Sequence, residues 1–166
     1  RFIAGNHDYW VLDFMKKKLM SHTYFDDTTF SLRGKNFYIT HGDGVLSWDY
    51  GYRILKKIIR SPFFIWCFRL LHPTLAYKIA RKVSRTENHP ELPKEVREKI
   101  RNELKNYAST HFKKGFDYMV CGHYHLNEII DVEKGKLAVL GDWQDDPSYA
   151  VFDGKELTLH PWENDA

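Results

Sequence analysis

The chain has 166 residues, enough for one domain with a buried core and too few for two domains of ordinary size. Its apolar fraction of 43% and its charged fraction of 28% are those of an ordinary globular protein. The net charge of +3 is mild and says little about partners until its distribution is examined. The longest apolar run falls short of the roughly 20 residues that a membrane-spanning helix needs, which excludes a spanning segment among these residues.

The first predicted element is a strand that ends at residue 4. A helix is expected from residue 9 to residue 20, with Trp10 and Phe14 facing inward. Strands at 29–32 and 36–40 flank the turn signal Arg33-Gly34-Lys35, so we expect a hairpin here.

Helical spacing of apolar residues follows from about residue 48 to residue 85, and Pro62 and Pro73 divide this stretch into two or three short helices. Pro93 suits the first turn of an amphipathic helix that runs to about residue 114. A buried strand at 118–121 and four short strands at 128–132, 136–140, 149–152 and 156–160 complete the chain. This succession predicts an α/β fold, a layered sandwich flanked by helices.

Three predicted loops carry side chains suited to metal ions, and each loop follows an apolar strand. They are Gly5-Asn6-His7-Asp8, His41-Gly42-Asp43 and Gly122-His123-Tyr124-His125. Loops at strand ends gather at one edge of a sheet, and imidazole nitrogen with amide oxygen suits Mn²⁺, Zn²⁺ or Fe. Each motif alone is more often an ordinary turn, surface or core feature than a ligand. Together, and in this order, they predict a site for metal-assisted cleavage of a phosphate ester.

This set of motifs resembles the calcineurin-like metallophosphoesterase superfamily. Its pattern is Asp-x-His, Gly-Asp, Gly-Asn-His-Asp/Glu, a His before Gly, and Gly-His-x-His, of which the last three blocks are present. The resemblance implies two divalent metal ions, Mn²⁺ in preference to Zn²⁺ or Fe, with Asn6, His41 and His123 on one ion and His125 on the other. It also implies that His7 stabilises the transition state or protonates the leaving group, and that Asp8 orients His7.

The first two blocks of the superfamily pattern do not occur before Asn6. They are N-terminal in the superfamily, and the sequence opens at Arg1 within an apolar run. We therefore expect residues 1–166 to be a single metallophosphoesterase domain that lacks its N-terminal part. One metal ion would then keep only His125, so we expect the chain alone to be weakly active or inactive and the full-length protein to be an enzyme.

The stretch at 48–114 is longer than a compact member of the superfamily needs, and we interpret it as a helical lid. It mixes aromatic residues such as Phe63 and Trp66 with basic residues such as Lys56, Arg60 and Arg81. This combination suits an acidic amphiphile or a membrane face. A helical subdomain with its own small core and a solvated rim fits the composition nearly as well.

Within the superfamily, the chain is most similar to the UDP-2,3-diacylglucosamine hydrolase family of lipid A biosynthesis. The similarity rests on Asp49 with Tyr52, on Arg81 with Ser84, and on Leu140-Gly141-Asp142-Trp143. It implies that Asp49, Tyr52, Arg81 and Ser84 bind an amphiphilic nucleotide-lipid substrate. The implied reaction is hydrolysis of the pyrophosphate bond to give UMP and 2,3-diacylglucosamine 1-phosphate.

The same resemblance implies a peripheral position on the cytoplasmic face of the inner membrane. Cys67 and Cys121 form no CxxC pair and lie in apolar stretches, so we expect buried, reduced thiols, which agrees with that compartment. No recognised nucleic-acid-binding module accompanies the basic residues, so nucleic acid is not an expected partner.

Two alternatives remain open. The first is a soluble calcineurin-like phosphodiesterase or phosphatase with another substrate, in which the apolar face at 63–71 is buried. It is favoured by His7, because the hydrolase family usually carries Arg after the metal-binding Asn. The second is a non-catalytic metal-binding module.

Overall fold

The computed structural model describes residues 1–8, 12–84 and 93–162. Its helices are α1 (Leu12–Phe14), which a π-helix (Met15–Leu19) continues, α2 (Tyr50–Ile59), α3 (Pro62–Arg69), α4 (Pro73–Ser84) and α5 (Lys94–Phe112). Its strands are β1 (Phe2–Ile3), β2 (Thr23–Tyr24), β3 (Thr28–Leu32), β4 (Lys35–Thr40), β5 (Tyr118–Cys121), β6 (Glu128–Val132), β7 (Gly135–Val139), β8 (Ser148–Phe152) and β9 (Leu157–Pro161).

The main sheet is mixed. Within the described residues it has five strands in the order β3-β4-β5-β7-β6. Strands β4, β5 and β7 run parallel, while β3 and β6 pair antiparallel with β4 and β7. The β3–β4 turn is tight because Arg33 and Gly34 both take a positive φ, 50° and 78°, as a two-residue hairpin turn requires. The predicted α/β class and the predicted hairpin are therefore confirmed.

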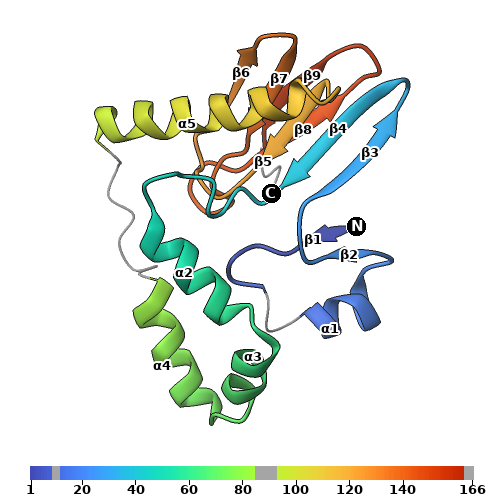
Figure 1. Cartoon of the computed structure of the whole chain (residues 1–166). Coiled ribbons are helices and arrows are strands. Elements are labelled where there is room, and N and C mark those ends of the chain that lie inside the picture. The colour runs from blue at the N-terminus through green and yellow to red at the C-terminus, as the bar shows by residue number, and fades with distance from the viewer. Residues whose placement is uncertain (9–11, 85–92, 163–166) are drawn as a thin grey trace.

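Layers pack on both faces of the main sheet (Figure 1). On one face, α5 buries Ile100, Leu104 and Ala108 in a core that also holds Met119 and Leu137 of the sheet. On the other face, the antiparallel β8–β9 hairpin contributes to a second core, which contains Phe37, Tyr118, Ala138 and Leu157. The sheet is thus held between a helix and a hairpin, and its strand ends are free to carry loops.

Leu104 lies at the centre of the α5 core, with 0% of its surface exposed. We expect Leu104→Ala to lower the free energy of unfolding by about 2–5 kcal/mol, because the lost methyl groups leave a cavity. At roughly 2–4 °C per kcal/mol, the melting temperature followed by circular dichroism should fall by about 5–15 °C. Val96→Ala on the same helix, at a side chain 40% exposed, should change it little. Equal shifts in the two variants would contradict the packing of α5 described above.

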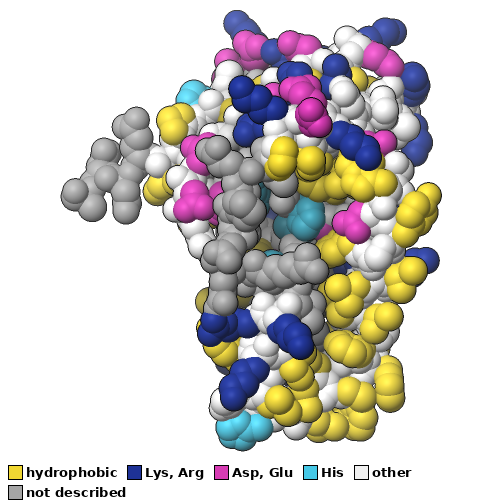
Figure 2. Space-filling view, turned by 90° about the vertical axis from the view of Figure 1, so that its left-hand side faces the viewer, with side chains coloured by type: hydrophobic (Ala, Val, Ile, Leu, Met, Phe, Trp, Pro, Cys, Tyr) yellow, Lys and Arg dark blue, Asp and Glu magenta, His cyan; other side chains and the backbone are white. Residues whose placement is uncertain are grey.

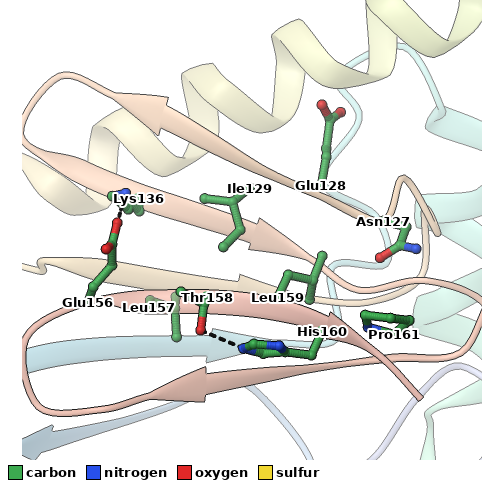
Figure 3. Close-up of a pocket in the computed structure, with 10 residues that line it drawn as sticks. All are labelled: Asn127, Glu128, Ile129, Lys136, Glu156, Leu157, Thr158, Leu159, His160 and Pro161. Atoms are coloured by element: carbon green, nitrogen blue, oxygen red, sulfur yellow. Dashed lines mark hydrogen bonds and ion pairs between the residues drawn. The ribbon is translucent and has the colours of Figure 1, made fainter. Parts of the chain in front are cut away.

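A cavity of about 630 Å³ lies between β6, β7 and β9 and is lined by Ile129, Leu157 and Leu159 among others. Figure 3 shows the residues that line it. The ion pair between Lys136 Nζ and Glu156 Oε1, 2.7 Å apart, lies across one end of the cavity. Its lining holds none of the residues predicted above for metal or substrate, so it is separate from the candidate site.

Helices α2, α3 and α4 form a lobe of their own beside the strand ends (Figure 1). We call it the lid lobe, residues 50–84. Helix α3 begins as predicted at Pro62, and the Ser61 hydroxyl accepts a hydrogen bond from the Phe64 N–H at 3.2 Å. The expected insertion at 48–114 therefore divides into two parts, because α5 packs on the main sheet and only α2–α4 lie apart from it.

The helix predicted at 9–20 differs from the structure. Its first residues, including Trp10, lie outside the described part of the chain. After Leu12–Phe14 the backbone becomes a π-helix, in which each turn holds more residues than an α-helical turn. Phe14 is 54% exposed, so the prediction that it faces inward is wrong. Among the cysteines, Cys121 is buried as predicted, but Cys67 is only partly buried; both are free.

Candidate active site

The candidate site lies at the carboxyl ends of the parallel strands. Thr40 of β4 is in register with Cys121 of β5, which is in register with Val139 of β7. The loops that follow these residues therefore leave the sheet at the same edge, which faces the lid lobe (Figure 1). In open α/β sheets this is the edge where ligands bind.

The loop after β1 reaches the same edge although β1 belongs to a separate pair of strands, β1 and β2. Asn6 Oδ1 lies 2.9 Å from His41 Nε2, so two of the predicted metal-binding atoms face each other. Gly5 allows this approach, because a Cβ placed there would lie 2.9 Å from His41 Cε1. The turn is held by Asp8, whose Oδ2 accepts a hydrogen bond from the Gly5 N–H at 2.8 Å.

His123 joins His41 from the loop after β5. The two rings are 5.1 Å apart between centroids and inclined at 66°, and the Gly122 N–H donates to the His41 carbonyl oxygen at 3.2 Å. His123 and His125 have φ angles of 62° and 48°. Left-handed backbone at these two histidine positions costs of order 1–3 kcal/mol each, and such strain often accompanies functional sites.

Both imidazoles in the centre are kept neutral by their surroundings. Burial lowers the pKa of His41, and burial followed by the neighbouring His41 lowers the pKa of His123 to about 4. A neutral imidazole keeps the lone pair that a metal ion needs. His41 and His123 are thus in the form that ligates metal throughout the neutral pH range.

His125 is held from behind by the loop after β7. Its Nδ1 lies 3.2 Å from Asp142 Oδ2, which is the arrangement by which a carboxylate orients a metal-binding imidazole. We expect Asp142→Asn to weaken Mn²⁺ binding about 10–100-fold, since losing such a partner typically costs that much. Titration calorimetry with Mn²⁺ would measure this. Unchanged affinity would show that His125 does not bind metal through this arrangement.

The donor set fits one metal ion better than two. Asn6, His41 and His123 supply an amide oxygen and two neutral imidazoles, which suit borderline metals such as Mn²⁺ and Zn²⁺. In the described part of the chain, His, Cys, Asp and Glu side chains form no group of three or more that could hold an ion. Of the predicted ligands, His125 alone remains for a second ion.

Three of the four predicted substrate-binding residues lie on the lid lobe, and Asp49 lies directly before it. Asp49 caps α2 by accepting the Tyr52 N–H at 3.1 Å, and the Tyr52 ring lies 5.8 Å from that of His123. Arg81 is exposed on α4 with its guanidinium carbon 5.7 Å from the centre of the Tyr77 ring. Ser84 ends α4, but its side chain lies outside the described residues. The geometry brings Tyr52 to the histidines.

Sequence reasoning missed one charged cluster at this edge. Asp43 is 6% exposed and contacts Tyr52 and Lys56 of α2 and Arg60, the C-terminal cap of that helix. Burial by itself would raise the pKa of Asp43, but the charges of Lys56 and Arg60 outweigh it and hold the pKa below its usual value. The only sequence signal was the spacing of Tyr52, Lys56 and Arg60, which are four residues apart in the helical stretch that follows the His-Gly-Asp motif.

Comparison with known proteins also indicates a hydrolase. No family model matches the chain. The UDP-2,3-diacylglucosamine hydrolase of Porphyromonas gingivalis is 32% identical over a gapped alignment of 181 residues. This alignment covers 98% of this chain and 68% of that protein. The hydrolases of Pseudomonas putida and Edwardsiella ictaluri are each 26% identical, over 96% and 99% of this chain and 68% and 67% of their own lengths.

An α/β chain with histidines and an asparagine gathered at one strand edge is organised as a hydrolytic enzyme would be. The similarity to the P. gingivalis protein extends over nearly the whole chain. The chain belongs to the UDP-2,3-diacylglucosamine hydrolase family.

Proposed function

We propose that this protein hydrolyses the pyrophosphate bond of UDP-2,3-diacylglucosamine, releasing UMP and 2,3-diacylglucosamine 1-phosphate in lipid A biosynthesis. Its family membership supports this reaction. One structural observation carries the proposal. Neutral histidines at the sheet edge adjoin a helical lobe whose apolar face is exposed, which is the arrangement that a phosphate-cleaving site beside an acyl-binding surface would need.

The exposed apolar face is clearest on α3. Phe63, Trp66 and Leu70 are 74%, 60% and 67% exposed, and they follow one another at helical spacing. Figure 2 shows hydrophobic side chains gathered over the lid lobe, and histidine in the hollow between the two lobes. A soluble phosphodiesterase with a buried 63–71 face would not look like this, so the exposure favours a lipid substrate.

A groove of about 610 Å³ opens beside this face. It is lined by Phe25, by Ile65 and Trp66 of α3, and by Leu70 at the C-terminal end of that helix; the ion pair between Arg69 and Asp13 lies at its rim. The volume falls within the range of about 300–1,000 Å³ that is usual for ligand sites. We assign this groove to an acyl chain of the substrate.

The proposed cofactors are two divalent metal ions, Mn²⁺ by preference. Asn6, His41 and His123 would hold one ion and His125 would contribute to the other. When bound, such ions would polarise the phosphoryl oxygens and lower the pKa of a water that attacks the phosphorus. The protein's own residues would present neutral imidazoles at fixed positions and hold the substrate phosphates near them.

His7 and Asp8 complete the proposed chemistry. The His7 side chain is exposed on the turn after β1, where a substrate phosphate can reach it. Its role would be to stabilise the transition state or to protonate the leaving group. Asp8 would orient His7 through the turn that it closes with the Gly5 N–H.

Substrate contacts from the lid lobe follow the same logic. Tyr52 and Asp49 stand at the start of α2 beside His123, where they are suited to the sugar phosphate. Arg81 is suited to a phosphate group through charge-assisted hydrogen bonds, with Ser84 one turn further along α4.

We also propose that the lid lobe rests on the cytoplasmic face of the inner membrane. No helix among the described residues is long and apolar enough to cross a membrane. The lid lobe combines exposed aromatic side chains with basic ones, as peripheral membrane surfaces do.

The deciding experiment measures UMP release from UDP-2,3-diacylglucosamine by the full-length natural protein with Mn²⁺. Bis(p-nitrophenyl) phosphate serves as a small phosphodiester in parallel, and EDTA is added to matched samples. Strong UMP release that EDTA abolishes is the expected result. Cleavage of the small diester alone would mean a phosphodiesterase with another substrate, and no activity on either compound would favour a non-catalytic metal-binding module.

A further inference from the structure

Asp43 has a position that the proposed chemistry leaves unexplained. It follows His41 by two residues, and its side chain is 3% exposed. Charged side chains are almost never fully buried unless they are paired. The residues that pair with the Asp43 carboxylate therefore indicate its structural role.

Every lid contact recorded for Asp43 comes from one stripe of α2 and its C-terminal cap. The Tyr52 hydroxyl donates to Oδ2 at 3.0 Å. Lys56 Nζ lies 3.1 Å from Oδ2 and donates to the Asp43 carbonyl oxygen at 2.6 Å. Arg60 Nη2 reaches both carboxylate oxygens, at 3.1 and 2.8 Å. Residues four apart lie on one helix face, so a single carboxylate fastens α2 along its whole length.

The same contacts tie the lid lobe to the candidate metal centre. The backbone of Asp43 continues the loop that begins at His41, and Gly42 between them takes a φ of 95°. Tyr52, which donates to Asp43, also has its ring 5.8 Å from that of His123. A shift of α2 would therefore alter the approach to both histidine loops.

We propose that Asp43 is a positioning residue that fixes α2, and with it the lid lobe, over the candidate metal centre, so that binding of an acylated substrate depends on this carboxylate. This inference rests on the proposed function, because it explains how the lid lobe is held in the position where it would bind the lipid substrate. A merely structural role would lower turnover of every substrate together.

The test compares Asp43→Asn and Arg60→Gln with Lys57→Gln in the full-length protein. Lys57 lies on the same helix, is exposed, and undergoes the same loss of charge as Arg60. KM and kcat are measured with UDP-2,3-diacylglucosamine and with bis(p-nitrophenyl) phosphate, which is too small to need the lid. We expect both cluster variants to raise KM for the lipid at least tenfold more than they change kcat, and to lower the lipid-to-diester ratio of kcat/KM at least tenfold. Lys57→Gln should leave both unchanged.

Hydrogen–deuterium exchange supplies a readout that does not depend on activity. Amides of α2 should exchange at least tenfold faster in the cluster variants, while those of β4 and β5 keep their wild-type rates. If a single variant fails to fold, the double variant Asp43→Asn/Arg60→Gln removes both charges of the buried pair and is tested in its place.

Equal losses on both substrates, or unchanged exchange in α2, would overturn the role of Asp43. A wild-type protein that cleaves only the diester would refute the lipid substrate instead. In that case the exchange measurement still decides whether Asp43 fixes α2.

Discussion

Replacing His123 by Ala is expected to lower Mn²⁺-dependent hydrolysis of UDP-2,3-diacylglucosamine by more than about a hundredfold. Loss of a residue that only orients a ligand typically costs about 10–100-fold, and loss of the ligand itself should cost more. His123 is central to the site because its ring packs against both His41 and Tyr52. Initial rates of UMP release and Mn²⁺ binding by calorimetry should fall together.

Two controls make the His123 result interpretable. His22→Ala removes an exposed histidine beside β2 and should leave both measurements unchanged. His123→Asn keeps a residue that tolerates the left-handed backbone at φ 62°, so it separates loss of the imidazole from a change in the loop. Full activity in the Ala variant, with normal Mn²⁺ binding, would remove His123 from the metal site.

The second large effect concerns the lid. We expect the triple variant Phe63→Ser, Trp66→Ser, Leu70→Ser to bind anionic lipid vesicles at least about a hundredfold more weakly. Burying one such side chain is worth about 1.5–3 kcal/mol, so even partial insertion of three exceeds the roughly 2.8 kcal/mol that a hundredfold change requires. All three are more than half exposed, so their loss should leave the free energy of unfolding nearly unchanged.

Cosedimentation with vesicles measures this effect, and thermal melting checks the fold. Leu32→Ser, Val96→Ser and Val151→Ser form a matched triple variant, since these residues are also exposed but lie outside the lid lobe. If both triple variants lose vesicle binding equally, the attraction is general hydrophobicity and the lid lobe has no special part in it. If neither binds less than wild type, the membrane contact lies elsewhere.

Much of the sheet could be predicted because its signals are local. The hairpin of β3 and β4 follows from a turn that needs positive φ at Arg33 and Gly34. The meeting of His41 and His123 was predictable for a different reason: parallel strands bring their loops to one edge whatever the distance along the chain. Asn6 reaches His41 from β1, which is outside this sheet, so its approach depends on how the two sheets pack.

Other features depend on tertiary contacts that no local pattern contains. Phe14 was predicted to face inward from α-helical spacing, and the π-helix that begins after it breaks that spacing. The burial of Asp43 depends on where α2 lies relative to the loop after β4, and the sequence shows only polar residues four apart. For the same reason, composition could not decide whether the 63–71 face is buried or exposed.

The direct pairing of β4 with β5 has a consequence for how the family can vary. Thr40 ends β4 and Tyr118, which is in register with Phe37, begins β5, so the connection between them is a crossover that joins two neighbouring parallel strands. The entropic free-energy cost of closing such a loop rises by only about 0.6 kcal/mol for each doubling of the loop's length. A lobe attached in this way can lengthen or shorten while the register of the sheet and its histidine loops stay the same.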